Sequence, residues 1–306
     1  MVSQFELQVP IYNAAGCKCT TKEDLNNIAS SSAGAIQTKS CTLAKRSGNQ
    51  PPKYWDNGTI SINSNGLENE GYQFYLDYAN EYSQSINASN QKPIILSVAG
   101  LSLDDNTKII TDTLKNNSIY ALELNLSCPN IGGIPVSSDV EVFNEYLNNI
   151  ISATSYNHSA KPIGLKLPVY TTRWHFEKVS HLVNKYDISF ITCSNSMPNC
   201  LQFEHINNPG EDIMTSKPVI LNKLGGGGGG EFMKGIVLGQ IYQFRNQLSE
   251  NVKIVMCGGI GYGMDCYEGQ LAGANYFQVG TQYMVEGESC FDRIISQYNR
   301  IRLANQ

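Results

Sequence analysis

The sequence has few charged residues and no large excess of either sign. Of its 306 residues, 22 are Lys or Arg and 27 are Asp or Glu, which gives a net charge of −5. No basic block occurs, so we expect no nucleic-acid partner. No apolar run reaches the ~18 residues of a membrane span, and the first residues lack the segments of a signal peptide. These absences predict a cytoplasmic protein that does not associate with a membrane.

Metal-ligand spacing is also missing. None of the four histidines lies at metal-ligand spacing from a cysteine, and no C-x-x-C pair occurs. We therefore expect no metal site. Without a secretion signal the thiols are expected to be reduced, and most of them to be small buried residues. The nine cysteines are scattered along the chain, at positions 17, 19, 41, 128, 193, 200, 257, 266 and 290.

Short apolar runs alternate with segments that carry helix-start signals such as Thr21-Lys22-Glu23-Asp24 and Ser102-Leu103-Asp104-Asp105. Eight such runs, alternating with helices, are typical of a (β/α)8 TIM barrel, because strands buried on both faces are continuously apolar. We predict a single domain over residues 1–306. The predicted strands are Ile11–Asn13, Ala35–Lys39, Ile94–Ala99, Ala121–Leu126, Ile163–Leu167, Ile188–Cys193, Lys253–Cys257 and Tyr276–Val279.

Two connections are too long to be plain turns. One runs from about Ser40 to Gln91, and the other from about Ser194 to Glu231, ending in the glycine tract Gly225–Gly230. In barrels, the loops that follow the strands build the active site. We therefore expect both insertions to cover the site at the C-terminal face of the strands.

Small and polar residues follow almost every predicted strand, as an active site at that face requires. Gly258-Gly259 and Gly280-Thr281 follow the last two strands, where barrels often bind phosphate through backbone N–H groups. Either turn taken alone is equally well explained as a tight connection. Together they favour a phosphorylated cofactor or substrate.

Three residues are candidates for the chemistry. Lys39 and Lys166 end predicted strands, where an ammonium group can stabilise charge that develops on an electron-rich ring. The alternative is that each lysine extends to solvent at the rim. Cys128 lies in a loop with Pro129 and Gly132, and a thiolate there can accept a proton. The sequence alone leaves open whether this thiol is reactive or inert.

From about residue 10 to residue 295 the chain resembles the dihydroorotate dehydrogenases, most closely the cytosolic, fumarate-linked class 1A. The segment Asn125-Leu126-Ser127-Cys128-Pro129-Asn130 after a strand is highly specific for the family, and cysteine within it separates class 1 from the membrane-bound class. Further matching segments are Asn13-Ala14-Ala15-Gly16, Thr38-Lys39-Ser40-Cys41-Thr42-Leu43, Arg46-Ser47-Gly48-Asn49, Ser61-Ile62-Asn63-Ser64, Gly164-Leu165-Lys166-Leu167-Pro168, Asn195-Ser196, Cys257-Gly258-Gly259 and Gly280-Thr281.

The resemblance implies that FMN binds across the barrel mouth, with its phosphate on the glycines that follow the last two strands. It implies a homodimer and a role in the biosynthesis of UMP. The FMN-binding residues that it implies are Ala14, Ala15, Gly16, Lys39, Ser40, Asn125, Lys166, Cys193, Gly229, Gly230, Cys257, Gly258, Gly259, Gly280 and Thr281.

The resemblance also implies the reaction. Cys128 would remove a proton from C5 of (S)-dihydroorotate while a hydride leaves C6, and fumarate would then accept the hydride at the same site. Lys39 would reach both cofactor and substrate, and is the second catalytic residue. The implied substrate-binding residues are Lys39, Asn63, Asn65, Gly66, Leu67, Asn125, Cys128, Asn130, Asn195 and Ser196.

Three departures from the family pattern concern the site. Asn65 stands where methionine is usual. The loop reads Asn130-Ile131-Gly132-Gly133-Ile134-Pro135 in place of Asn-Val-Pro-Gly-Lys-Pro. The tract Gly225–Gly230 is uninterrupted, so we expect a softer loop beside the cofactor.

Four other functions remain open at this stage. One is a class 1B catalytic subunit that passes electrons to NAD through a partner protein. A second is a related FMN barrel that acts on another pyrimidine, for which Asn65 is the motivating difference. A third is an inactive FMN-binding paralogue. The last is a flavin-free phosphate-binding barrel that uses a lysine Schiff base.

Overall fold

Eight short parallel strands form a nearly closed barrel at the centre of the computed structural model, which describes residues 4–126, 136–155, 161–186, 188–207 and 214–305. The order around the barrel is β1-β14-β13-β8-β7-β6-β5-β2. This arrangement confirms the predicted (β/α)8 barrel. Its strands are β1 (Ile11–Asn13), β2 (Ile36–Gln37), β5 (Ile94–Val98), β6 (Ala121–Asn125), β7 (Ile163–Leu167), β8 (Phe190–Cys193), β13 (Lys253–Cys257) and β14 (Tyr276–Val279).

All eight predicted strands are present, and four have the predicted bounds. The largest difference is β2, which is two residues long because its ladder with β5 covers only Ile36 and Gln37. On the other side of β2, the side chain of Asn13 replaces a ladder. Its amide donates to the carbonyl oxygen of Gln37 at 2.8 Å and accepts from the Gln37 N–H at 2.9 Å. The barrel is therefore closed between β1 and β2 partly by one buried amide.

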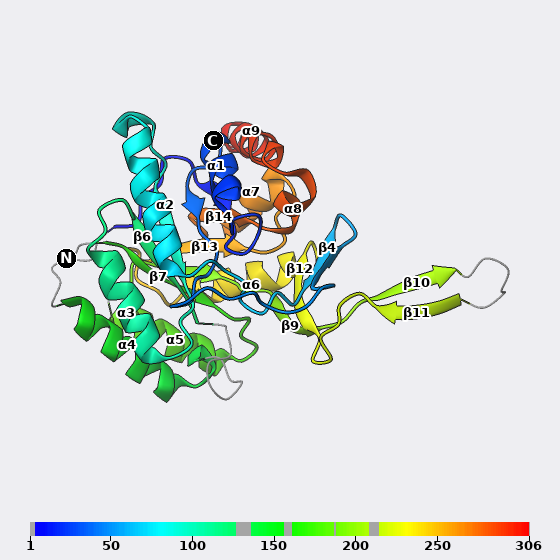
Figure 1. Ribbon diagram of the computed structural model, residues 1–306, viewed down its shortest axis with the longest axis horizontal. Coiled ribbons are helices and arrows are strands. Elements are labelled where there is room, and N and C mark those ends of the chain that lie inside the picture. Colours follow the sequence, from blue (N-terminus) through cyan, green and yellow to red (C-terminus); the bar gives the residue numbers. More distant parts are fainter. Residues whose placement is uncertain (1–3, 127–135, 156–160, 187, 208–213, 306) are drawn as a thin grey trace.

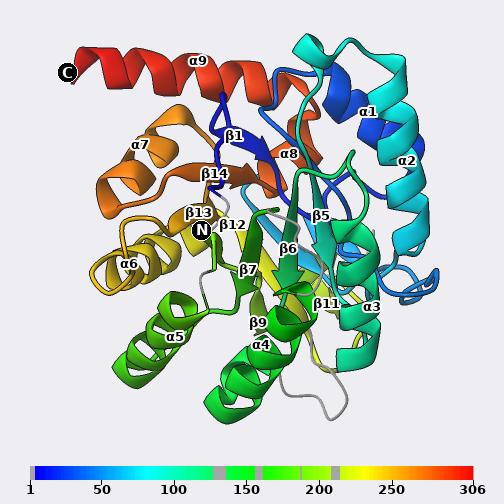
Figure 2. The ribbon, with the colours of Figure 1, turned by 90° about the vertical axis from the view of Figure 1, so that its left-hand side faces the viewer.

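Helices surround the barrel, as Figure 2 shows. Two of the predicted helix starts are confirmed as N-caps: Thr21 forms a capping box with Asp24, and the Ser102 hydroxyl accepts from the Asp105 N–H. Among the described residues, no helix is long and apolar enough to cross a membrane. The helices are α1 (Lys22–Ser30), α2 (Tyr72–Ser85), α3 (Leu103–Leu114), α4 (Val140–Ser155), α5 (Arg173–Lys185), α6 (Met233–Arg245), α7 (Gly263–Ala272), α8 (Thr281–Glu286) and α9 (Ser289–Ala304), with 3-10 turns η1 (Ala88–Asn90) and η2 (Val136–Ser138).

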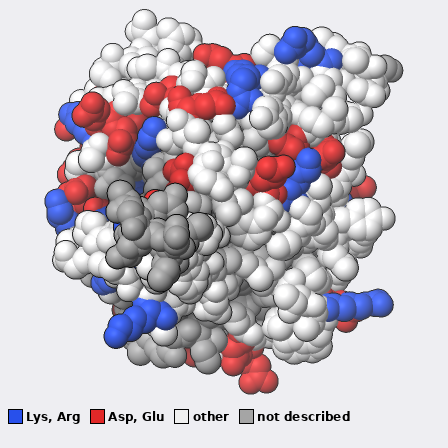
Figure 3. All heavy atoms as spheres, turned by 90° about the vertical axis from the view of Figure 1, so that its right-hand side faces the viewer, with Lys and Arg blue, Asp and Glu red and all other residues white. Residues whose placement is uncertain are grey.

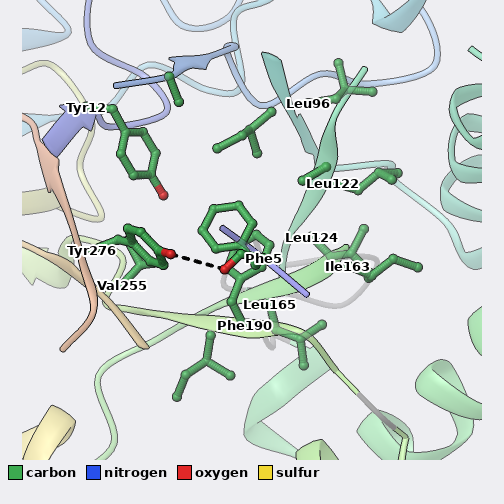
Figure 4. Packing of buried hydrophobic residues seen from close by; sticks show 14 of the residues in the cluster. Phe5, Tyr12, Leu96, Leu122, Leu124, Ile163, Leu165, Phe190, Val255 and Tyr276 are labelled. Atoms are coloured by element: carbon green, nitrogen blue, oxygen red, sulfur yellow. Dashed lines mark hydrogen bonds between the residues drawn. The ribbon is translucent and has the colours of Figure 1, made fainter. Parts of the chain in front are cut away.

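Aromatic side chains fill the N-terminal end of the barrel (Figure 4). The ring of Phe5 stacks on Phe190 with 4.1 Å between centroids, and the Tyr276 hydroxyl donates to the Phe5 carbonyl oxygen at 3.2 Å. Gly164 provides the space for Phe190, since a β-carbon at this position would overlap the ring. This end is therefore a packed core, and the opposite end is left for a site.

The two insertions meet in a four-stranded antiparallel sheet of order β3-β4-β12-β9. The first contributes β3 (Tyr54–Asp56) and β4 (Ile60–Asn63), and the second contributes β9 (Met197–Cys200) and β12 (Gly226–Gly230). The glycine tract is thus a central strand paired on both sides, and not the soft loop that its composition predicts. Its backbone approaches β4 and β9 too closely for side chains at most positions.

Parts of both insertions do not cover the site. In the first, residues 72–85 form helix α2, which lies against the barrel beside α1 and α3 in Figure 2. In the second, β10 (Phe203–Asn207) and β11 (Met214–Pro218) form a hairpin arm that projects away from the barrel (Figure 1). The expectation that both insertions cover the C-terminal face is therefore correct only for their sheet-forming parts.

Candidate active site

A cavity of about 380 Å³ opens at the C-terminal ends of the barrel strands. This volume lies within the range of small-molecule pockets, which is about 300–1,000 Å³. The wall comes from β7, from the segments that follow five other barrel strands, and from the four-stranded sheet. The predicted site residues that line it are Ala14, Ala15, Gly16, Lys39, Asn63, Asn65, Lys166, Asn195, Ser196, Gly229, Gly230, Cys257, Gly258, Gly259, Gly280 and Thr281.

One end of the cavity is a cradle of backbone and hydroxyl groups. Gly259 has φ +76°, and a β-carbon there would overlap the backbone of Lys234. Opposite, the hydroxyls of Ser61 and Thr281 are hydrogen-bonded at 2.8 Å. A β-carbon on Gly229 would lie 2.9 Å from the Ser61 hydroxyl oxygen. The absence of a side chain at Gly259 therefore lets the turn pack against the start of α6, and at Gly229 it leaves the space beside the Ser61 hydroxyl open.

Asp265 fixes the turn after β13. Its Oδ2 accepts from the N–H groups of Gly261 and Tyr262 at 2.8 and 2.7 Å, and its Oδ1 accepts from Lys234 Nζ at 2.8 Å. The hydrogen bonds from Lys234 to Asp265 and Glu268 raise the pKa of the Lys234 ammonium group well above its usual value. The glycine turn is therefore held by a charged group that stays ionised through the physiological range.

Both predicted lysines are buried, at 7% exposed for Lys39 and 3% for Lys166. Lys39 Nζ donates to the carbonyl oxygen of Gly16 at 3.0 Å. Burial favours the neutral form of Lys166, but Cys257 and Glu123 outweigh it and raise the pKa of the ammonium group above its ordinary value. Burial raises the pKa of the Cys257 thiol. A positively charged lysine beside a neutral thiol therefore lies at the cavity floor.

A chain of hydrogen-bonded amides and hydroxyls follows the lysines. Asn195 Nδ2 donates to Asn125 Oδ1 at 3.1 Å, and Asn125 Nδ2 donates to the Ser40 hydroxyl at 3.2 Å. Asn63 Nδ2, from the opposite sheet, donates to the Gly227 carbonyl oxygen at 2.9 Å. Amide groups from two sides suit a ring with both N–H and C=O edges.

Several predicted site residues do not line the cavity. Ser40, Asn125, Cys193, Gly66 and Leu67 are absent from its wall. Asn125 and Ser40 contact it indirectly through Asn195, and Cys193 immediately precedes the lining residue Ser194. Cys128 and Asn130 lie outside the described residues, so the predicted base has no structural account here.

Sequence reasoning missed other lining residues, among them Tyr54, Ser61, Cys17 and Glu68. Ser61 could have been found, because it is two residues from Asn63 on β4 and alternate residues of a strand share a face. Cys17 directly follows the Asn13-Ala14-Ala15-Gly16 segment. Burial raises its pKa to about 12, so it is a neutral thiol at physiological pH.

Comparison with known proteins identifies related chains. A family model described as dihydroorotate dehydrogenase matches residues 1–301. A dihydroorotate dehydrogenase (fumarate) of Lachancea kluyveri is 39% identical over 287 residues, which cover 93% of this chain and 87% of that protein. The protein of the same name from Kluyveromyces lactis is 37% identical over 294 residues, covering 95% and 89%.

Solved structures share the fold. A crystal structure of DHODH from Eimeria tenella, in complex with ferulenol, superposes with a TM-score of 0.78 over 96% of this chain and 82% of that one. The sequence identity is 15%, so this likeness concerns the barrel alone.

Proposed function

Because the chain belongs to the dihydroorotate dehydrogenase family of oxidoreductases, we propose that its cavity binds FMN and oxidises (S)-dihydroorotate to orotate, with fumarate as electron acceptor. This reaction serves the biosynthesis of UMP. The relatives named for fumarate favour this acceptor over NAD. The observation that carries the proposal is one cavity that contains both a glycine cradle and two buried lysines.

The residues present fit FMN. Gly229, Gly258 and Gly259 line this end of the cavity, and successive backbone N–H groups at such glycine turns form a common phosphate-binding surface. Lys166 places a positive charge in the cavity floor, where it would stabilise negative charge on an electron-rich ring. When bound, FMN supplies the hydride acceptor of the reaction.

The chain's own residues supply the rest of the chemistry. Asn63 and Asn195 would hold the amide edges of the pyrimidine, and the Lys39 ammonium group would neutralise negative charge between substrate and cofactor. Cys128, which lies outside the described residues, is the proposed base that removes the proton from C5. The roles of Asn65, Gly66, Leu67, Asn130 and Ser196 at the substrate follow from the family resemblance.

The test is an anaerobic titration of the purified protein with L-dihydroorotate while the flavin absorbance is recorded. We expect the absorbance to bleach and fumarate to restore it. Cys128→Ser should retain FMN but bleach about 10²–10⁴-fold more slowly at neutral pH, the usual contribution of a general base. A yellow protein that does not bleach would favour another pyrimidine, whereas a colourless protein that cannot be reconstituted with FMN would contradict the proposal. Bleaching at an unchanged rate in the variant would rule out Cys128 as base.

We further propose that the protein is a cytoplasmic homodimer in which the β10–β11 arm contacts a second copy. An isolated two-stranded hairpin is only marginally stable in water. Phe203 at the base of this arm is 45% exposed, and Leu201, which precedes the arm, is 49% exposed. On the face that bears the arm, charges of both signs are interspersed and large areas carry none (Figure 3). The described cysteines are all free thiols, which supports a reducing compartment.

Sedimentation velocity tests the dimer. Phe203→Asp should place a charge in the contact and shift the protein to monomer. Leu303→Asp, the same kind of change at an exposed residue of α9, should leave the dimer intact, because this helix lies apart from the arm in Figure 1. A wild-type protein that sediments as a monomer at all concentrations would contradict the dimer.

A further inference from the structure

A polar cluster lies inside the barrel, beneath the floor of the cavity. Its centre is Glu123 on β6, which is 0% exposed and does not line the cavity. Glu123 Oε2 accepts from the Thr192 hydroxyl and from Gln278 Nε2, both at 2.7 Å. Its Oε1 accepts from Gln37 Nε2 at 3.3 Å. Four strands thus contribute to one buried cluster at a place that barrels usually fill with apolar side chains.

The hydrogen bonds suit the ionised form of the carboxyl group. All three described partners donate, and an ionised carboxylate is an acceptor only, whereas a protonated one has a hydrogen to donate. A buried charge is expensive unless an opposite charge lies near it. The cluster therefore requires a cation inside or just above the barrel.

Lys166 meets this requirement. It lies on β7, directly opposite Thr192 in the β7–β8 ladder, and Thr192 donates to Glu123. It also lies opposite Asn125 in the β6–β7 ladder, two residues beyond Glu123 on the same strand and face. Burial lowers the pKa of the Lys166 ammonium group, but the electrostatic contributions of Cys257 and then of Glu123 outweigh burial and raise this pKa.

Other titratable groups face the same ammonium group. Cys257 lies on β13, and Cys17 and Cys19 follow β1. Each of these thiols contributes to the raised pKa of the Lys166 ammonium group. The charge of Lys39 acts to lower the pKa of the Cys17 and Cys19 thiols, so Lys39 lies near the same two groups. Burial raises the pKa of all three thiols, so they are neutral at physiological pH. Glu123 is then the source of negative charge among these groups.

We propose that Glu123 is a positioning residue, which holds Lys166 protonated and directed at the cofactor from beneath the cavity floor. Glu123 acts through Lys166 and touches neither cofactor nor substrate. The inference rests on the proposed function only in that Lys166 faces FMN.

The experiment compares wild type with Glu123→Gln, which keeps the shape of the side chain and removes its charge. The pKa of Lys166 is measured by NMR on isotope-labelled lysine, and the reduction potential of bound FMN is measured as a function of pH. We expect the pKa of Lys166 to fall by about one unit, which is tenfold in its protonation constant. At neutral pH the potential should rise by about 30 mV, which is tenfold for a two-electron couple, because positive charge is no longer offset. In the plot of reduction potential against pH, the step caused by deprotonation of Lys166 should occur at a lower pH in Glu123→Gln than in wild type.

Two variants separate positioning from a structural role. Thr192→Val removes one hydrogen bond that holds the carboxylate and should change both readouts by a smaller amount, because the charge stays but its fixed position is lost. It therefore tests the proposal even if Glu123→Gln does not fold. Gln240→Leu removes a buried amide that bonds Tyr170 and Pro168 outside the cluster. It should lower the Tm and leave both readouts unchanged.

Unchanged lysine titration and potential in both cluster variants, with only a lower Tm, would overturn the proposal. The lysine titration requires no turnover, so the result is distinct from a failure of the proposed reaction. A protein that bleaches with dihydroorotate but shows no shift in Lys166 contradicts this inference alone.

Discussion

Lys166→Met should slow the reduction of bound FMN by dihydroorotate about 10²–10³-fold, the usual effect of removing one group that stabilises developing charge. Methionine fills nearly the same volume without the ammonium group, so the barrel should stay folded. Lys166 is buried at the cavity floor, where its charge is little screened by solvent. Single-turnover stopped-flow measurement of flavin bleaching gives the rate directly.

Lys185→Met is the matched control for this result. Lys185 is exposed at the end of α5 and does not line the cavity. Its replacement should leave the bleaching rate within a factor of two of wild type. Equal rates for Lys166→Met and wild type would show that the lysine has no part in the reaction.

Gly259→Ala should weaken FMN binding at least about tenfold, which corresponds to 1.4 kcal/mol. The residue has φ +76°, where an L side chain costs about 1–2 kcal/mol, and its β-carbon would overlap the backbone of Lys234. The turn must therefore move, and with it the backbone that forms the cradle. We also expect the free energy of unfolding to fall by about 1–3 kcal/mol. Titration of the apoprotein with FMN, followed by flavin fluorescence, measures the affinity.

Gly235→Ala provides the contrast. Gly235 is exposed on α6, and an added β-carbon meets nothing within 4 Å. Alanine there should stabilise the protein by about 0.5–1 kcal/mol, the usual helical difference from glycine. FMN affinity should not change. If both variants bind FMN as wild type does, the cradle is assigned to the wrong end of the cavity.

Much of the barrel could be predicted because its elements are determined locally. The run Ile163–Leu167 is a strand with the predicted bounds, since continuous burial on both faces requires an apolar run. Thr21 and Asp24 form the predicted helix start, because a capping box uses only residues three apart. Polar residues at the ends of such strands were therefore predictable as a group, and most of them line the cavity.

The four-stranded sheet could not be predicted in the same way. Its central strand is made of glycines, which have low strand propensity and no side chains to show periodicity. That strand exists because Ile62 on β4 and Met197 on β9 both pair with Gly228. These partners are far apart in sequence, so Tyr54 of the cavity wall was not identified.

Strand β12 also sets the spacing between the two ends of the cavity. Gly229 pairs with Ser61 at the cradle, and Gly227 pairs with Asn63 at the amide end. The two positions are separated by about 7 Å, because a strand rises about 3.4 Å per residue. A strand of identical residues contains no internal cue to its register, and a slip by one would turn Ser61 and Asn63 away from the cavity. The hydrogen bond from Asn63 to Gly227 therefore also fixes the register between β4 and β12. The same amide that would orient a substrate thus determines how far that substrate lies from the phosphate end of the cavity.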